Sequence, residues 1–121
     1  MELRLELRGM DGLSERLAPD GLLAAARDAM ASELFAVAQD ARTLCPVQTG
    51  RLQGSIAVRV QEDGAAGEVV AGAPYAACVE LGTADRAAHP FLYPAFAARR
   101  TGMTEQIARA VIRRAESGGE G

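Results

Sequence analysis

A long helical segment that stops at a proline is the feature that most constrains this chain. Before Pro46, apolar side chains recur three, four or seven residues apart, which is the spacing of one helix face. Pro19 and Asp20 suit the first turn of such a helix, and Pro46 cannot continue it, so the helix is expected to end near Cys45. The stripe comprises Leu23, Ala26, Met30, Leu34, Val37, Ala41 and Leu44.

The residues after Pro46 must reverse the chain. Gly50 can adopt a backbone conformation that other residues resist, and Thr49 or Ser55 can cap the backbone groups that the helix end leaves free. Strict alternation of apolar and polar residues then predicts a strand over 56–60. The turn sequence EDGAAG and the segment EVVAG complete a hairpin, and the alternating MELRLELR at the start of the chain predicts another strand.

Two further helices follow the hairpin. PYAACVELGT begins with proline and closes at Gly82, with Tyr75, Cys78 and Val79 expected to face inward. A last helix is expected from Pro94, and the row expected along its inner side is Phe96, Ala97, Arg100, Met103, Ile107, Val111 and Ala115. The prediction is an α+β fold in which a long helix packs across a small antiparallel-type sheet, with a second C-terminal helix. Residues 1–116 are expected to form a single domain and 117–121 a disordered tail. The side chains expected to be largely buried are Leu34, Val37, Leu44, Leu52, Ile56, Val58 and Tyr75.

Composition and charge exclude several classes of function. The chain has 121 residues, its 13 basic residues are all arginine, and its formal net charge of -3 disfavours binding to nucleic acid through phosphate neutralisation. No secretory signal pattern or membrane-spanning apolar run is present, so a protein made in the cytoplasm is expected. Cys45 and Cys78 lack the CxxC spacing of a redox or metal site, and buried free thiols are expected.

Catalytic chemistry would depend on a single histidine. His89 could act with Cys45 or Cys78 as a nucleophile pair, but both cysteines fall in apolar-patterned segments and no anion-binding glycine loop accompanies them. One histidine, two separated cysteines and scattered acids make no metal-ligand cluster. The chain is therefore expected to be no enzyme and to need no cofactor or metal.

Several charged residues have two open interpretations. Glu80 lies in the last turn of the short helix, where the helix dipole disfavours an acid. It is either a solvated carboxylate or the partner of an arginine in the same or the next subunit. The loop from Gly82 to Pro90 is expected to be mobile in the isolated subunit and to become ordered on docking. The arginines of the last helix form either a solvated face or a contact with an acidic neighbour. The residues expected at interfaces are Arg86, His89, Arg109, Arg113 and Arg114.

Three short motifs occur in a fixed order and carry a family resemblance. The patterns are P-x-x-T-G-x-L-x-x-S-I, Y-A-x-x-V-E-x-G-T and P-F-L-x-P-A. In this order they resemble the bacteriophage tail-completion family, the small head–tail joining (minor tail component) proteins of long-tailed phages and prophages. The residues that match are Pro46, Thr49, Gly50, Leu52, Ser55, Ile56, Tyr75, Ala76, Val79, Glu80, Gly82, Thr83, Pro90, Phe91, Leu92, Pro94 and Ala95.

The resemblance implies a structural role in the virion. Such proteins assemble as rings, often of six copies, at the head–tail junction beneath the head-closure or connector proteins and above the tail-terminator or tail-tube proteins. DNA passes through the lumen without specific binding, and neither a membrane nor a cofactor takes part. The alternative is a generic oligomeric adaptor or protein-binding module that is not associated with a virion.

Overall fold

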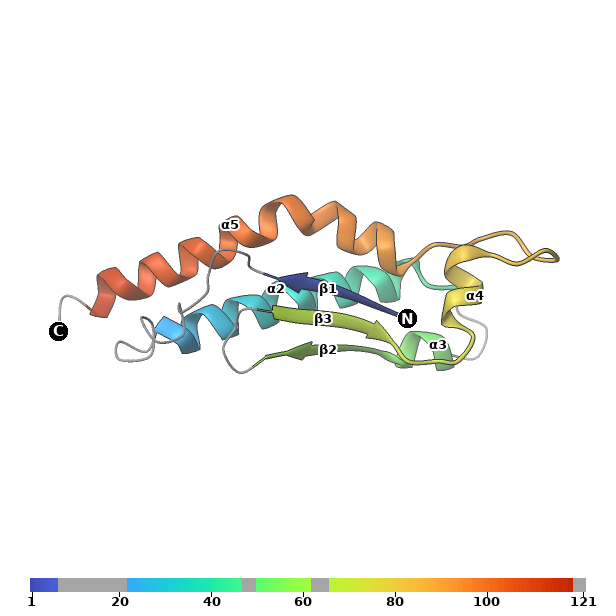
Figure 1. Cartoon of the computed structure of the whole chain (residues 1–121), viewed down its shortest axis with the longest axis horizontal. Helices are drawn as coiled ribbons and strands as arrows, with labels where there is room; N and C mark the ends of the chain where they lie inside the picture. Colours follow the sequence, from blue (N-terminus) through green and yellow to red (C-terminus); the bar gives the residue numbers. More distant parts are fainter. Residues whose placement is uncertain (7–21, 47–49, 62–65, 119–121) are drawn as a thin grey trace.

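The computed structural model describes residues 1–6, 22–46, 50–61 and 66–118, and it has the predicted α+β architecture (Figure 1). Within these residues, three antiparallel strands form one sheet, which is accompanied by two long helices and two short ones. The strands are β1 (Glu2–Glu6), β2 (Ile56–Val60) and β3 (Ala66–Ala71). The helices are α2 (Leu22–Leu44), α3 (Arg51–Gly54), α4 (Ala76–Leu81) and α5 (Leu92–Gly118).

The sheet has the order β1-β3-β2, so the last strand in the sequence is the central one. The predicted hairpin is confirmed: Val58 lies opposite Val69, and on the other side of β3 the backbone of Leu3 also lies opposite Val69. The N-terminal residue Met1 exchanges two hydrogen bonds with Ala71, of 3.1 and 2.8 Å. The two strands at the edges of the sheet are therefore β1 and β2.

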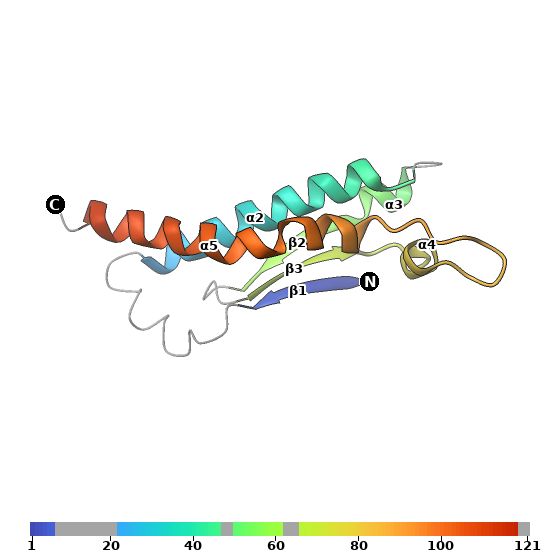
Figure 2. The ribbon, with the colours of Figure 1, turned by 90° about the horizontal axis from the view of Figure 1, so that it is seen from above.

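The two long helices run antiparallel to each other along the length of the sheet (Figures 1 and 2). α2 contacts β2 and β3, whereas α5 packs along α2 and touches β1. Both helices therefore help to cover the sheet, and the space between the layers is filled by apolar side chains from α2, β3 and the first half of α5. The largest fully buried ones are Phe91, Met30, Leu34, Leu92, Met103, Ile107, Val37 and Val69.

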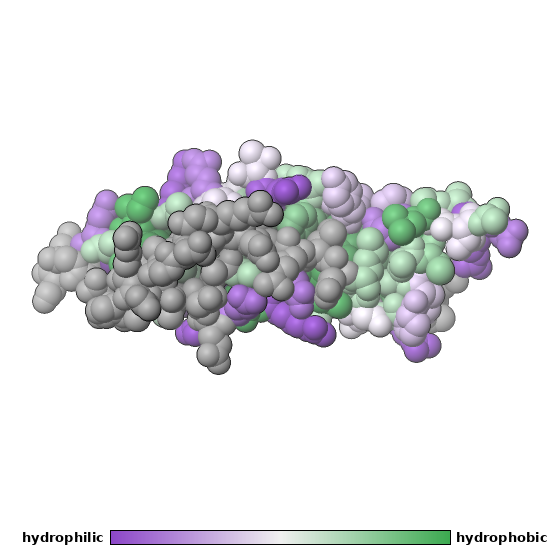
Figure 3. All heavy atoms as spheres, in the orientation of Figure 1, coloured by the Kyte–Doolittle hydropathy of each residue, from purple (hydrophilic) through white to green (hydrophobic). Residues whose placement is uncertain are grey.

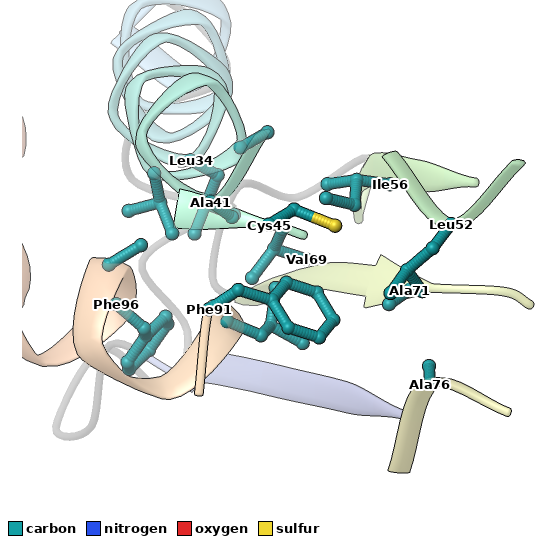
Figure 4. Packing of buried hydrophobic residues seen from close by; sticks show 14 of the residues in the cluster. Leu34, Ala41, Cys45, Leu52, Ile56, Val69, Ala71, Ala76, Phe91 and Phe96 are labelled. Atoms are coloured by element: carbon teal, nitrogen blue, oxygen red, sulfur yellow. The ribbon is translucent and has the colours of Figure 1, made fainter. Parts of the chain in front are cut away.

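Phe91 is the largest of these residues, and it lies just before α5. Its ring points into the space between the end of α2 and β3, toward Cys45 and Val69 (Figure 4). At the other end of β3, Gly67 leaves room for α2 to approach closely, because a Cβ there would come within 2.5 Å of the Leu34 side chain. The absence of a side chain at Gly67 thus allows Leu34 to pack directly on the sheet.

The predicted apolar stripe of α2 is confirmed from Ala26 to Ala41 and is wrong at its last position, while the side chain of Leu23 lies outside the described part of the chain. Ala26, Met30 and Ala41 are buried, but Leu44 is 50% exposed. The inward position one turn after Ala41 belongs instead to Cys45, whose N–H donates to the Ala41 carbonyl at 2.9 Å. Burial raises the pKa of the Cys45 thiol. Pro46 follows the helix end as predicted.

The predicted inward face of α4 is wrong at two of its three positions, and the third, Val79, is half-buried and packs against the core. Tyr75 is 37% exposed and Cys78 is exposed, so Cys78 is not the buried thiol that was expected. The side chains that α4 buries are Ala76 and Glu80, which are one turn apart. Only six residues long, α4 turns just one narrow edge toward the core, and it leaves Ala77, Cys78 and Leu81 exposed.

α5 starts two residues before the predicted start at Pro94 and continues to Gly118, two residues past the predicted boundary at 116. Pro94 is tolerated in the first turn because the N–H that it lacks would be unpaired there. Ala97 and Arg100, which were expected on the apolar side, are exposed. Three predicted features lie outside the described residues: the helix start at Pro19 and Asp20, the cap at Thr49 and the hairpin turn at 62–65.

One ion pair links the two long helices on the surface. Arg99 Nε lies 2.6 Å from Asp40 Oδ2. The hydrogen bond to Arg99 lowers the pKa of the Asp40 carboxyl, and the same bond raises the pKa of the guanidinium. Because both side chains are more than a third exposed, solvent screens this pair and it contributes little to stability.

Replacing Leu34 with alanine tests the packing of α2 on the sheet. Leu34 is fully buried over Gly67, so Leu34→Ala should lower the free energy of unfolding by about 2–5 kcal/mol. Leu44→Ala removes the same side chain from a half-exposed position of the same helix and should cost less than about 1 kcal/mol. Urea unfolding measures both values, and equal losses in the two variants would contradict this orientation of the helix.

Candidate functional site

The first motif forms a hydrogen-bonded corner between α2 and β2. Gly50 has φ 78°, the left-handed conformation that was predicted for this position. Gln53 Nε2 donates to the Arg42 carbonyl at 3.0 Å, and Arg42 Nη2 donates to the Ile56 carbonyl at 2.9 Å. Ser55 Oγ donates to the Leu52 carbonyl at 2.7 Å, so this side chain caps the end of the short helix α3 and not, as predicted, the end of the long helix, whose Arg42 carbonyl is bound by Gln53. The corner therefore joins the end of the long helix rigidly to the start of the sheet.

The second and third motifs are connected through Glu80. This carboxylate is only 3% exposed, and it accepts hydrogen bonds from the backbone N–H groups of Phe91, Leu92 and Tyr93 at 3.2, 2.8 and 3.3 Å. These N–H groups belong to the start of α5 and have no acceptor within the helix. A negative charge at this helix end is also favoured by the dipole. Both interpretations drawn from the sequence are therefore wrong: Glu80 is neither solvated nor paired with an arginine, and it caps α5.

The loop between these two motifs has a defined path. Gly82 has φ 76° and ψ 173°, and a Cβ there would lie 2.7 Å from the Ala88 nitrogen. Thr83 N–H donates to the Arg86 carbonyl at 2.9 Å, and Arg86 N–H donates to Thr83 Oγ1 at 3.1 Å. His89 N–H donates to the Val79 carbonyl at 2.8 Å. All residues from 83 to 90 are nevertheless exposed, and their mobility in the isolated subunit stays a prediction.

The corner, α4 and the loop border one open groove of about 830 Å³, which we call the motif groove. It lies at the end of the molecule where α3 and α4 are found, away from the C-terminal end of α5 (Figure 1). Each of the segments that border it contains residues of the family motifs. Its described lining residues are Pro46, Gly50, Arg51, Leu52, Tyr75, Cys78, Val79, Arg86, Ala87 and His89.

Exposed apolar side chains gather at the same end of the molecule. Six large apolar side chains are exposed in the described part of the chain, and four of them belong to the end of α2, to α4 and its preceding residue, or to the start of α5. These four are Leu44, Tyr75, Leu81 and Tyr93. Figure 3 shows apolar surface at this end of the molecule, interrupted by hydrophilic surface where the loop after α4 lies. Exposed apolar surface of this kind is typical of a protein interface.

The polar side chains of the groove were compared with the requirements of a metal site. Cys78 and His89 both line it, but the described residues contain no group of three or more His, Cys, Asp or Glu side chains that could hold a metal ion. Within the same residues, no buried side-chain nitrogen or oxygen lacks a hydrogen-bond partner. None of the described helices has the length and apolar character needed to cross a bilayer.

The structure separates the expected interface residues into two sets. Arg86 and His89 line the motif groove, whereas Arg109, Arg113 and Arg114 are exposed on the second half of α5, which lies toward the opposite end of the molecule (Figure 1). Arg109 makes an ion pair with Glu105 of the same helix at 2.7 Å. The sequence reasoning missed Arg51 and Cys78 as groove residues, because only the tertiary fold brings the corner next to α4.

Substitution of Glu80 tests its role at the start of α5. Glu80→Gln removes the charge and leaves an amide that cannot accept all three hydrogen bonds, so it should cost about 1–3 kcal/mol of folding free energy. Amide hydrogen exchange at Phe91, Leu92 and Tyr93 should accelerate. The control Glu105→Gln changes an exposed acid of the same helix and should alter stability by no more than about 0.5 kcal/mol. Unchanged exchange at the three amides would show that Glu80 is not the cap.

Two glycine substitutions test the path of the loop. The backbone angles of Gly82 lie in a region that is essentially restricted to glycine, so Gly82→Ala should destabilise the fold by about 1–3 kcal/mol or more. Gly102 lies in α5 with no neighbour within 4 Å of an added Cβ, so Gly102→Ala should stabilise by about 0.5–1 kcal/mol. Opposite signs in denaturant unfolding are expected, and a neutral Gly82→Ala would contradict the loop geometry.

One comparison with known proteins assigns the chain to a family. A family model described as "Bacteriophage HK97-gp10, putative tail-component" matches residues 10–82, which is more than half of the chain. The matched region contains α2, the corner, the β2–β3 hairpin and α4, and thus the first motif and all of the second except its last residue, Thr83. No curated protein and no solved structure matches the chain. The chain therefore belongs to the HK97-gp10-like family of bacteriophage tail components.

Proposed function

We propose that this protein is a tail-completion component at the head–tail junction, where it acts as a subunit of an oligomeric ring and performs no catalysis. The observation that carries the proposal is the meeting of the motif segments around one groove, with exposed apolar side chains gathered at the same end. Family membership supports a structural role in the virion and contacts with other virion proteins. Head-closure or connector proteins on one side and tail-terminator or tail-tube proteins on the other are the partners that we propose.

The construction of this end of the molecule supports a role in assembly. Hydrogen bonds that Gln53 donates and that Glu80 and Thr83 accept hold the backbone that borders the motif groove, while the side chains directed outward are largely apolar or basic. A surface that is ordered before contact loses less conformational entropy on binding. A hydrogen-bonded backbone with outward apolar and basic side chains suits a subunit that must join its neighbours in one defined geometry.

The net charge of the chain supports passage of DNA through the ring. Summed over several subunits, a formal charge of -3 gives a ring that does not bind phosphate through counterion release. We therefore propose that the genome passes through the lumen without specific binding. Retention of duplex DNA by the purified protein in a gel-shift titration at physiological salt would contradict this part of the proposal.

Deletion of the gene from its phage or prophage tests the junction role. We expect filled heads and complete tails that remain separate in electron micrographs, because the defect lies in their joining. Expression of the wild-type chain in trans should restore joined particles. Normal particles from the deletion strain would refute the junction role, whereas a defect in tail length or in head filling would place the protein at another step.

A variant at the single histidine separates contact from catalysis. His89→Gln keeps a polar side chain of similar length in the groove but removes acid–base capacity, and it should restore particle joining as well as the wild type does. Complementation of the deletion strain measures this. Loss of a chemical activity in a folded His89→Gln variant would contradict a purely structural role.

A further inference from the structure

The polar part of the motif groove is basic. Arg51 comes from the corner, Arg86 and His89 come from the loop, and none of the described lining residues is acidic. Glu80 and Asp85 adjoin lining residues in the sequence but do not line the groove themselves. The Glu80 carboxylate is buried and bound to the start of α5, so it does not offset the charge of the groove. A docked surface that complements this lining must therefore supply carboxylates.

The bottom of the groove is apolar. Leu52 is only 5% exposed and Val79 is half-buried, so these two lining residues lie below the rim, where Tyr75 is 37% exposed. Figure 4 shows Leu52 of α3 and Ala76 of α4 pointing toward the end of β3 at Ala71. An apolar side chain that entered the groove would be removed from water here, which favours binding.

The charges of the described surface disfavour a second copy of the chain as the occupant. Three acids already form ion pairs with arginines of the same chain, at 2.6, 3.4 and 2.7 Å: Asp40, Glu68 and Glu105. The other acids whose described side chains are exposed lie singly on α2, on the loop and at the end of α5: Asp28, Asp85 and Glu116. The described part of the chain therefore offers no cluster of unpaired carboxylates that matches the groove.

We infer that the motif groove binds an acidic segment of a different virion protein, with an apolar side chain seated against Leu52 and Val79 and carboxylates beside Arg86 and His89. The inference rests on the proposed function at the head–tail junction and states the chemistry of the partner. Opposite charges steer such a segment into the groove and fix its register. The apolar side chain in the desolvated bottom of the groove supplies most of the affinity.

The two cysteines provide a built-in reporter for occupation of the groove. Cys78 is exposed in the groove, whereas Cys45 is buried and has a raised pKa, so a thiol reagent should modify Cys78 first. Filling of the groove should slow the modification of Cys78. Cys78→Ser provides the background rate that belongs to Cys45.

A pair of synthetic peptides tests the chemistry of the occupant. Both peptides carry leucines at the same positions, and these are flanked by glutamates in one peptide and by lysines in the other. The glutamate peptide should protect Cys78 at a concentration at least about tenfold lower than the lysine peptide. This protection should weaken as the salt concentration rises.

Two matched charge reversals show whether the preference belongs to the groove. Arg86→Glu places a negative charge in the groove and should abolish the preference for the glutamate peptide. Arg100→Glu reverses an exposed arginine of α5 that does not line the groove, and it should keep the preference. Circular dichroism and urea unfolding establish that each variant is folded.

The same thiol identifies the natural partner. The protein with a photoreactive label on Cys78 is mixed with heads and tails from the deletion strain and irradiated. Mass spectrometry should find a crosslink to a segment of a head or tail protein in which carboxylates adjoin apolar residues. In complementation, Arg86→Glu should reduce the number of joined particles at least about tenfold, and a lysine in place of one of those partner acids should restore it. Arg100→Glu should join particles as the wild type does.

Four results would overturn the inference: equal protection of Cys78 by the two peptides, a crosslink between two copies of this chain, a crosslinked segment without acids, or normal joining by Arg86→Glu. These failures are distinguishable from failure of the proposed function. Unjoined heads and tails in the deletion strain would keep the junction role even if the groove preferred neither peptide. Normal particles from the deletion strain would refute the junction role, whereas the peptide measurements would still decide the chemistry of the groove.

Discussion

The buried carboxylate of Glu80 is the interaction on which this architecture depends most. It accepts three backbone hydrogen bonds at the start of α5, which would otherwise leave unpaired N–H groups in a buried position. Because Glu80 belongs to α4, the bond network joins the two helices across the exposed loop. It also fixes the start of α5 where Phe91 enters the core. The same carboxylate therefore supports both the packing of the long helices and one border of the motif groove.

The other border depends on a second set of backbone contacts. Gly50 allows the chain to turn, and Gln53 and Arg42 tie the end of α2 to the corner and to β2. Several motif residues thus hold the backbone through a glycine turn or a hydrogen bond: Gly50, Ser55, Glu80, Gly82 and Thr83. They keep the segments of the groove in place, and residues between the motif positions, such as Arg51, Cys78 and Arg86, add to its lining.

The sequence predicted the elements well where one periodicity continued over many residues. The buried face of α2 was identified from Met30 to Ala41, and the β2–β3 hairpin followed from alternation on both sides of a glycine-containing turn. The errors lie at element ends. Leu44 was placed inside because the helical spacing allowed it, but Cys45 occupies the inward position where the helix stops. In α4 six residues are too few for the spacing to indicate which side faces the core, so Tyr75 and Cys78 were assigned inward and lie outside.

The sequence by itself determined the α+β class, the abrupt end of the long helix, the left-handed turn at Gly50 and the family. These features depend on local backbone preferences and on the order of residues that are close in the sequence, and both can be read from the sequence alone. Only the tertiary structure decided the role of Glu80 and the existence of the motif groove. The acceptor and its donors are 11 to 13 residues apart, and the groove joins segments separated by two strands. An acid can be solvated, paired with an arginine or bound to a helix terminus, and folding decides which by the groups that it brings next to the carboxylate. The free energy of the charged carboxylate is set by those neighbours rather than by its place in the sequence.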